Sequence, residues 1–218
     1  CIYPQDPSLL PYKEENLHKG EPHPSNYGYA FAKRQHEVMC RIYNQAGGNH
    51  VCLIPNNLYG PNDNFDLNNA HVIPAIISKT FTAIQENKQL SLPGSGKGQR
   101  EFTYVHDIAR QLLAYMIQYV YGLGIKPTLV NLGNNEEVTI KEVTIKICDT
   151  FEQMGHQIPF DKEQIFSKEK FNQEYDGIFR KPSSLELLHS VLPKTKNPTT
   201  INSGIIDTIN WYLNERNR

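Results

Sequence analysis

The sequence is poor in cysteine and has no long apolar run, which argues against a disulfide-rich protein and against a membrane-spanning one. The four cysteines are far apart along the chain and lack the spacing of metal ligands: Cys1, Cys40, Cys52 and Cys148. Such spacing favours reduced thiols over a disulfide framework. No apolar stretch approaches the ~20 residues of a transmembrane helix, and the first residues show no basic-then-apolar signal pattern. We therefore expect a cytoplasmic protein without a metal site or a membrane segment.

An excess of charge of one sign is also missing. The 218 residues include 22 Lys and Arg against 23 Asp and Glu, which gives a formal net charge of -1. A chain so balanced has no electrostatic preference for nucleic acid or for an anionic membrane. Because 39% of the residues are hydrophobic, the chain is able to bury a core. We expect a globular protein that binds neither polyanion.

A glycine-rich turn that could cradle a phosphate is the third absence. No G-x-x-G-x-x-G stretch occurs in the sequence. The segment 94–98, Gly-Ser-Gly-Lys-Gly, lacks the spacing of a P-loop, and no clear strand and helix flank it. We expect a surface turn there.

Hydrophobic periodicity predicts helices that alternate with short strands, which is typical of an α/β protein. We expect helices at residues 27–46, 73–86, 107–121, 139–154 and 201–214, and strands at 51–55, 100–105 and 128–132. Gly47 and Gly48 suit the end of the first helix. Asp107 is placed to cap the third helix, and Thr139 with Glu142 predicts a capping box for the fourth.

Two of these strands are expected to form the large parallel sheet, namely 51–55, as a buried strand, and 128–132. The remaining short strands would form a smaller lobe. Residues 166–172 are polar and weakly patterned, which predicts a mobile loop.

A tyrosine and a lysine four residues apart, Tyr29 and Lys33, are the most informative feature that is present. Residues at i and i+4 share a helical face, so the ammonium group of Lys33 can lie beside the Tyr29 ring. A fixed cation stabilises a phenolate and lowers the pKa of a phenol from about 10. Such a proton donor suits a ketone reductase. Taken alone, the short pattern favours an amphipathic helix with two ordinary polar residues.

The pattern does not stand alone. Residues 52–65 form an apolar, strand-like run that stops in a cluster of Pro, Asn and Gly, the kind of loop at which open α/β sheets bind ligands. Together these features resemble the extended short-chain dehydrogenase/reductases that act on nucleotide-linked sugars, and more narrowly the GDP-L-fucose synthases. Five segments, in order along the chain, carry the resemblance: 1–4, 26–33, 54–65, 71–74 and 100–107.

The resemblance implies a partial Rossmann-type, NAD(P)-binding parallel sheet with a smaller C-terminal α/β substrate-binding lobe. Residues 1–70 would be the C-terminal part of the dinucleotide-binding domain, and 71–218 mainly the substrate lobe, with 107–133 returning a helix and a strand to the Rossmann sheet. Because the family opens with a glycine-rich turn that is absent here, we expect the chain to lack the first part of that domain and a serine that normally precedes Cys1.

The resemblance also implies a reaction and its residues. The cofactor would be NADP(H), and the substrate GDP-4-keto-6-deoxy-D-mannose, which the family epimerises at carbons 3 and 5 and reduces at carbon 4. Tyr29 would lie at the ketone oxygen, where it would stabilise the enolate and later donate a proton. Lys33 would hold the nicotinamide ribose. Cys1 matches the epimerisation base and His71 its acid. The alternatives are an uninvolved thiol for Cys1 and a structural histidine for His71.

Further positions match the family's binding residues. The nicotinamide would be bordered by Pro55, Asn56, Asn57 and Leu58, together with Lys33 and His71. The sugar nucleotide would be contacted by Asn57, Lys79, Arg100 and Asp176. Solvated surface charge is the alternative for Lys79 and Arg100. Where close relatives have a tryptophan this chain has Pro93, which leaves the specificity for GDP open.

Two other functions fit the same sequence. Another nucleotide-sugar epimerase or dehydratase would share Tyr29 and Lys33 without needing Cys1 and His71. A non-catalytic, dimerising module would keep only the helices at 27–46 and 73–86, through which the family resemblance implies a homodimer. The apolar side chains of the first helix are explained equally well if they pack into the core of the same chain.

We predict that the 218-residue polypeptide expressed alone is poorly soluble. An apolar strand edge would lack a partner, and helices would lack a sheet to cover. Sedimentation velocity of the isolated polypeptide checks this, and a well-behaved monomer that melts cooperatively would contradict it.

Overall fold

The computed structural model describes residues 1–122, 126–166, 179–192 and 198–216. The chain divides into two compact units, each built from three separate stretches. The first unit contains Cys1–Asn57, His106–Glu136 and Lys181–Pro198, and the second contains Leu58–Val105, Glu137–Arg180 and Thr199–Arg218. The roles that the sequence suggests for its two domains stay predictions.

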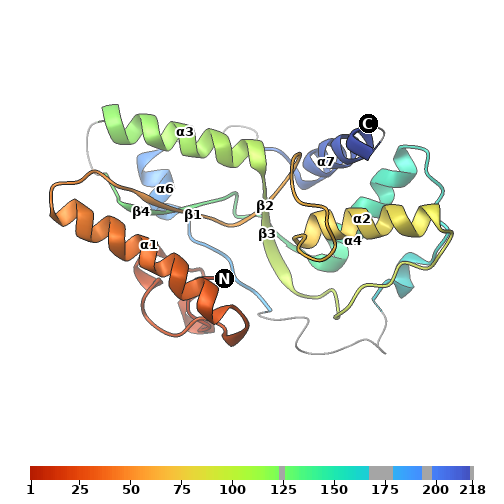
Figure 1. Cartoon of the computed structure of the whole chain (residues 1–218), viewed down its shortest axis with the longest axis horizontal. Coiled ribbons are helices and arrows are strands. Elements are labelled where there is room, and N and C mark those ends of the chain that lie inside the picture. The colour runs from red at the N-terminus through yellow and green to blue at the C-terminus, as the bar shows by residue number, and fades with distance from the viewer. Residues whose placement is uncertain (123–125, 167–178, 193–197, 217–218) are drawn as a thin grey trace. The chain divides into compact units, whose positions relative to one another are not determined.

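The first unit contains a parallel sheet of two strands, β1 (Cys52–Pro55) and β4 (Leu129–Leu132). Cys52 pairs with Leu129 and Pro55 with Leu132, so the carboxyl ends of both strands lie at one edge (Figure 1). The helices of this unit are α1 (Tyr27–Gln45), α3 (Val105–Tyr121, except its first residue) and α6 (Glu186–Val191), with three short 3-10 turns: Pro7–Leu9, Glu14–Asn16 and Pro24–Asn26. The predicted α/β class with a parallel sheet is confirmed.

Helix α1 ends where its glycines predict. Gly47 has a φ of +89°, a conformation that costs glycine little, and the Gly48 N–H donates to the Tyr43 carbonyl at 2.8 Å. The helix therefore stops cleanly before β1.

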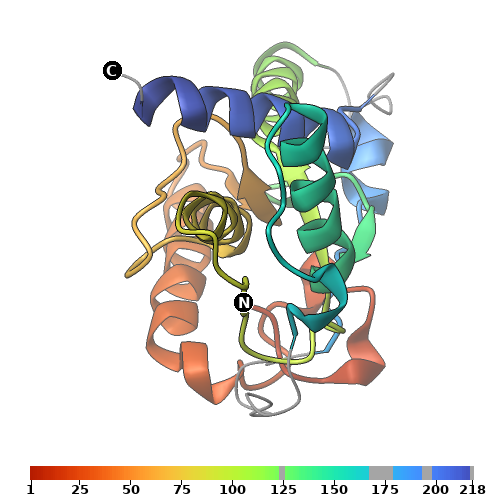
Figure 2. The same cartoon turned by 90° about the vertical axis from the view of Figure 1, so that its right-hand side faces the viewer.

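The second unit has a three-stranded sheet in the order β2 (Asn57–Tyr59), β3 (Gln99–Tyr104) and β5 (Glu137–Thr139), with β3 and β5 antiparallel. Its helices are α2 (Val72–Gln85), α4 (Ile140–Gln153) and α7 (Ile201–Arg216), with a 3-10 turn at Lys162–Gln164. Helix α4 packs against both α2 and α7, and α7 runs crosswise to it in Figure 2. Fully buried side chains fill the space between these elements, among them Ile73, Ile77, Ile147, Phe151, Ile205 and Ile209.

The predicted capping box at the start of α4 is present. The Thr139 hydroxyl accepts from the Glu142 N–H at 3.1 Å, and a Glu142 carboxylate oxygen accepts from the Thr139 N–H at 2.7 Å. The carbonyls of Gly96 and Gly98 accept from the N–H groups of Lys141 and Ile140. Residues 94–98 are thus a bend whose glycines are buried, and the expected surface turn is wrong for all but its exposed lysine.

Two further expectations need correction. Helix α3 begins at Val105, so Asp107 lies within its first turn as a buried partner of Arg110 at 2.8 Å and is not its cap. Strand β1 is only partly buried, because β4 is its one hydrogen-bonded neighbour in the described part of the chain.

The sequence pattern also missed β2, which lies within an Asn- and Pro-rich run that reads as loop. The loop expected at 166–172 falls, after its first residue, outside the described residues. Within the part of the chain that is described, none of the helices is both long and apolar enough to span a bilayer.

Gly204 in α7 generates a test of the second unit's packing. A Cβ there would collide with the hydroxyl of the buried Tyr59 and approach the Tyr104 ring to 3.0 Å, so we expect Gly204→Ala to lower the free energy of unfolding by about 1–3 kcal/mol. Gly28→Ala on α1 makes the same change where nothing lies within 4 Å, and should stabilise by up to about 1 kcal/mol. Urea unfolding compares the two, and equal midpoints would contradict this packing.

Candidate active site

Helix α1 presents Tyr29 and Lys33 on one exposed face. The Lys33 Nζ lies 5.7 Å from the centroid of the Tyr29 ring, and Tyr29 is 57% exposed. The predicted pairing of the two side chains is therefore confirmed as geometry. A phenol that is open to a ligand and has a cation at its ring can donate a proton to a carbonyl oxygen. The roles of the two residues stay predictions.

The loop that begins at Cys1 belongs to the same unit as this helix. The Cys1 thiol is exposed, and the Nζ of the half-buried Lys181 lies 3.4 Å from its Sγ. The two residues are 180 positions apart in the sequence.

Arg34, the residue after Lys33, ties this loop to α1. Its Nε donates to the Ile2 carbonyl at 2.7 Å and its Nη1 to the Gly20 carbonyl at 2.8 Å. The side chain is buried, and that burial lowers the pKa of its guanidinium. Hydrogen bonds from a charged donor to carbonyls are among the stronger ones in proteins, so Arg34 sets the position of Cys1 against the helix that carries Tyr29.

Asn131, near the end of β4, holds three segments together. Its Oδ1 accepts from the Tyr3 hydroxyl at 2.6 Å, while its Nδ2 donates to the carbonyls of Tyr12 at 3.1 Å and Ser184 at 3.2 Å. The Tyr3 and Tyr12 rings stack with centroids 4.9 Å apart. Asn131 is fully buried, and every polar side-chain atom of a buried amide needs such partners.

The backbone N–H of Asn131 has a partner as well. It donates to the Glu14 carboxylate at 2.8 Å, and burial raises the pKa of Glu14. The chain around Cys1 is thus fixed on several sides by groups with little access to water.

The carboxyl edge of the parallel sheet carries the residues predicted to border the cofactor. The Asn56 N–H donates to the Leu132 carbonyl at 3.1 Å, and a Cβ on the next residue, Gly133, would lie 2.5 Å from the Asn56 Nδ2. Gln111 of α3 bonds both the N–H and the carbonyl of Gly133. Ligands of open α/β sheets bind at this edge. The roles of Pro55, Asn56 and Asn57 at the cofactor stay predictions.

The other predicted site residues belong to the second unit. His71 is exposed and directly precedes α2, and Lys79 is half-buried on that helix. The Nη1 of Arg100 on β3 donates to the carbonyls of Gln99 at 2.7 Å and Phe179 at 3.3 Å. Leu58 is half-buried in β2. Asp176 lies outside the described residues.

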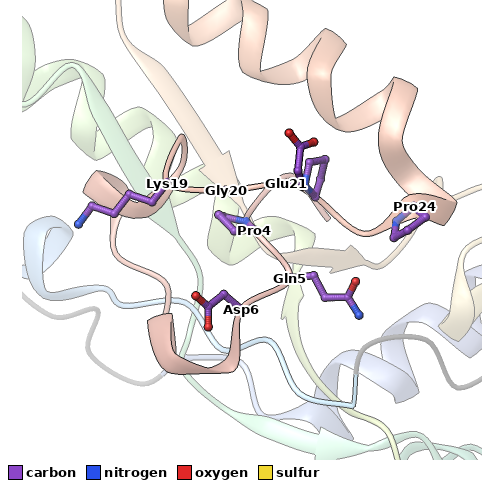
Figure 3. A pocket seen from close by; sticks show the side chains of 8 residues that line it. Pro4, Gln5, Asp6, Lys19, Gly20, Glu21 and Pro24 are labelled. Atoms are coloured by element: carbon purple, nitrogen blue, oxygen red, sulfur yellow. The ribbon is translucent and has the colours of Figure 1, made fainter.

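An open pocket of about 410 Å³ lies in the first unit beside the Cys1 loop. It is lined by Pro4, Gln5, Asp6, Lys19, Gly20, Glu21, Pro22 and Pro24. Figure 3 shows the ammonium group of Lys19 and the carboxylate of Glu21 pointing away from each other. None of the predicted site residues lines this pocket, so it adds no chemistry to the site.

The remaining thiols differ from Cys1 in their surroundings. All four cysteines are reduced thiols, but burial raises the pKa of Cys52 to about 11 and that of Cys148 to about 12. Those two stay neutral thiols near pH 7. In the described residues, His, Cys, Asp and Glu nowhere form a group of three that could hold a metal ion.

Sequence reasoning missed Lys181, Arg34 and Asn131. Lys181 lies five positions after Asp176, a predicted substrate-binding residue, so its place in the sequence was a usable signal. Arg34 reads as an ordinary cation on a helix face, and Asn131 as a polar interruption of an apolar strand. The residues next to Arg34 and Asn131 in the sequence do not indicate the distant residues to which these two side chains bond.

A family model places this arrangement of helix, loop and sheet edge among known proteins. The model of the NAD dependent epimerase/dehydratase family matches residues 1–133. The chain belongs to that family. The match covers the Cys1 loop, α1 and both strands of the parallel sheet.

Individual members of the epimerase/dehydratase family match nearly the whole chain. A GDP-L-fucose synthase of Dictyostelium discoideum is 35% identical over 214 residues, 98% of this chain and 62% of that protein. A GDP-L-colitose synthase of Yersinia pseudotuberculosis is 33% identical over 221 residues, 100% of this chain and 66% of that protein. The chain spans about three fifths of the length of the first of these relatives.

Solved structures agree with the epimerase/dehydratase assignment. The crystal structure of a GDP-L-fucose synthetase from Naegleria fowleri bound to NADP superposes with a TM-score of 0.78 at 31% identity. The superposition covers 100% of this chain and 63% of that chain. The present fold is therefore Rossmann-like.

The tie between Arg34 and the Cys1 loop generates a second test. We expect Arg34→Met to lower the free energy of unfolding by about 1–3 kcal/mol, because the carbonyls of Ile2 and Gly20 lose their donors. Arg41→Met on the same helix removes an exposed guanidinium that pairs with the carboxylate of Glu37 at 3.4 Å, so it should cost less than about 1 kcal/mol. Thermal unfolding of both variants checks this, and equal losses would contradict the anchoring role.

Proposed function

We propose that the protein catalyses the NADPH-dependent 3,5-epimerisation and 4-reduction of GDP-4-keto-6-deoxy-D-mannose to GDP-L-fucose. The observation that carries this proposal is the exposed Tyr29–Lys33 pair in one unit with a loop that presents the Cys1 thiol. Relatives named GDP-L-fucose synthase, such as the one that is 35% identical, support the choice of substrate.

Epimerisation begins at the ketone. Its carbonyl makes the hydrogens on carbons 3 and 5 acidic, so inversion needs a base on one face, an acid on the other and a partner for the enolate oxygen. Cys1, as thiolate, takes the proton: the C–H bond breaks, an S–H bond forms, and the electron pair moves onto the ketone oxygen. His71 returns a proton to the opposite face of the carbon. The Tyr29 hydroxyl donates a hydrogen bond to the enolate oxygen.

Reduction follows at the same ketone. NADPH, when bound, supplies the hydride for carbon 4. Tyr29 donates its hydroxyl proton to the ketone oxygen, and the ammonium of Lys33 stabilises the phenolate that remains. Lys33 also holds the nicotinamide ribose, with Pro55, Asn56, Asn57 and Leu58 as its border and His71 beside it. The holder of the pyrophosphate is not among these residues.

The sugar nucleotide is held by polar side chains. Asn57 reaches the sugar, and Lys79, Arg100 and Asp176 contact the GDP part. A guanidinium suits a diphosphate because its fork of N–H groups matches two oxygens, and Arg100 is held in place by two backbone carbonyls.

The protein is proposed to work as a cytoplasmic homodimer. Four cysteines in the reduced state fit a reducing compartment. Helix α1 exposes apolar side chains that a second copy could cover: Tyr27, Phe31, Met39, Ile42 and Tyr43. Most apolar side chains of α2 are buried within their own unit, so α1 supports the dimer better than α2 does.

A second candidate is action on a related GDP-linked keto sugar. The relative named GDP-L-colitose synthase is 33% identical, close to the value for the GDP-L-fucose synthase. Pro93, which stands where close relatives have a tryptophan, leaves the nucleotide side of the site less defined.

The test is incubation of the protein, expressed from its complete coding sequence, with NADPH and GDP-4-keto-6-deoxy-D-mannose in deuterated water. We expect oxidation of NADPH and a GDP-L-fucose product with deuterium at carbons 3 and 5. Product from a different GDP-linked keto sugar alone would favour the second candidate. No product from either sugar would sink the proposal.

Matched variants assign the proton donor. Tyr29→Phe should slow reduction about 10²- to 10⁴-fold, because the ketone oxygen loses its acid. Tyr27→Phe makes the same change on an exposed ring of the same helix and should leave the rate within about twofold, because its hydroxyl has no part in the proposed proton transfers. Rates of NADPH oxidation compare them, and a Tyr29→Phe rate equal to that of Tyr27→Phe would exclude Tyr29 as the acid.

A further inference from the structure

The contact between Lys181 and Cys1 has no part in the chemistry described so far. The Nζ of Lys181 lies 3.4 Å from the Cys1 Sγ, a separation typical of a hydrogen bond to sulfur. Lys181 is half-buried, whereas the thiol is exposed and able to meet a ligand.

A hydrogen-bonded framework holds this pair together. The segment that follows Lys181 is fixed to the loop around Tyr12: the Tyr12 N–H donates to the Pro182 carbonyl at 2.9 Å, and the Ser184 N–H donates to the Tyr12 carbonyl at 2.8 Å. The Tyr12 ring stacks on Tyr3, two residues after Cys1. Asn131 closes the framework by bonding to all three of Tyr3, Tyr12 and Ser184. Hydrogen bonds that do not involve the thiol or the ammonium therefore fix the two segments that carry them.

Other charged groups also lie near this loop. Arg34 adds positive charge at the carbonyl of Ile2, next to Cys1. Glu14 faces the framework from the far side, at the Asn131 N–H, and burial raises the pKa of its carboxyl. Glu21 pairs with the loop through its backbone carbonyl, which accepts from Gln5. Lys181 places its charge within hydrogen-bonding distance of the Cys1 sulfur.

We propose that Lys181 is a positioning residue that keeps Cys1 ionised as the epimerisation base. This inference rests on the proposed function and extends it to a residue with no assigned role. The ammonium stabilises the thiolate, which is the form of a cysteine that accepts a proton from carbon. When the thiolate takes that proton, the charge moves to the enolate, and the ammonium stays fixed by its framework.

The Lys181 ammonium lowers the pKa of the Cys1 thiol. An opposite charge within about 4–6 Å lowers the pKa of an acid by about 1 to 3, and solvent screening at the exposed Cys1 favours the low end of that range. At Cys52 and Cys148 burial dominates and raises the pKa of each thiol, although Lys162 acts in the opposite direction at Cys148. Selective ionisation of Cys1 follows from this contrast.

The first experiment measures the ionisation of Cys1 directly. Alkylation by iodoacetamide is followed at each cysteine by peptide mass spectrometry from pH 5 to pH 10, in the protein expressed from its complete coding sequence. We expect Lys181→Met to raise the pH midpoint for Cys1 by about 1, which is a tenfold slower alkylation below the midpoint. Lys181→Arg should restore it. Lys13→Met removes an exposed ammonium of the same unit, one paired with Glu186 at 3.0 Å, and should leave the midpoint unchanged.

The second experiment connects ionisation to the reaction. Exchange of the hydrogens at carbons 3 and 5 with deuterated water is measured against pH, and the Lys181→Met profile should move to higher pH together with the alkylation midpoint. An unchanged alkylation midpoint in Lys181→Met, with wild-type thermal unfolding, would overturn the role of Lys181. If the wild-type protein makes no product while Lys181→Met still shifts the midpoint, the proposed function fails and the pairing stands.

Discussion

The buried carboxamide of Asn131 is the interaction on which the geometry of the first unit depends. Its oxygen and its nitrogen are both engaged, with the hydroxyl of Tyr3 and the carbonyls of Tyr12 and Ser184. An unsatisfied amide in such a place would be costly, so these three segments hold one arrangement. Because Asn131 belongs to β4, its hydrogen bonds fix the Cys1 loop to the parallel sheet.

A second tie connects that loop to α1, the helix that carries Tyr29. Arg34 lies one position after Lys33 on α1 and bonds the carbonyl of Ile2, one position after Cys1. Under the proposed function one ketone reacts twice, first by proton exchange and then by reduction, which needs groups held by residues that are themselves fixed. Asn131 and Arg34 supply that support, and both are buried.

The sequence predicts much of the fold and the exposed part of the site. Helices α1, α2, α4 and α7 follow from periodicity and caps, since Gly47 and the Thr139–Glu142 box are local signals. The Tyr29–Lys33 pairing follows from the turn of a helix. The supports do not follow, because Asn131 bonds to a residue 128 positions away and no periodic pattern records such a partner. Strand β2 was missed for a related reason: its neighbours in the sheet, and not its own residues, make it a strand.

A crystal structure of the complete protein with NADP⁺ and GDP-L-fucose bound tests most directly whether the loop and the helix serve one sugar. The predicted result has the Tyr29 hydroxyl about 3 Å from the oxygen on carbon 4, within hydrogen-bonding reach, and the Cys1 sulfur facing carbon 3 or carbon 5. A sugar whose carbon 4 lies beyond the reach of Tyr29, or whose ring faces away from Cys1, would contradict it.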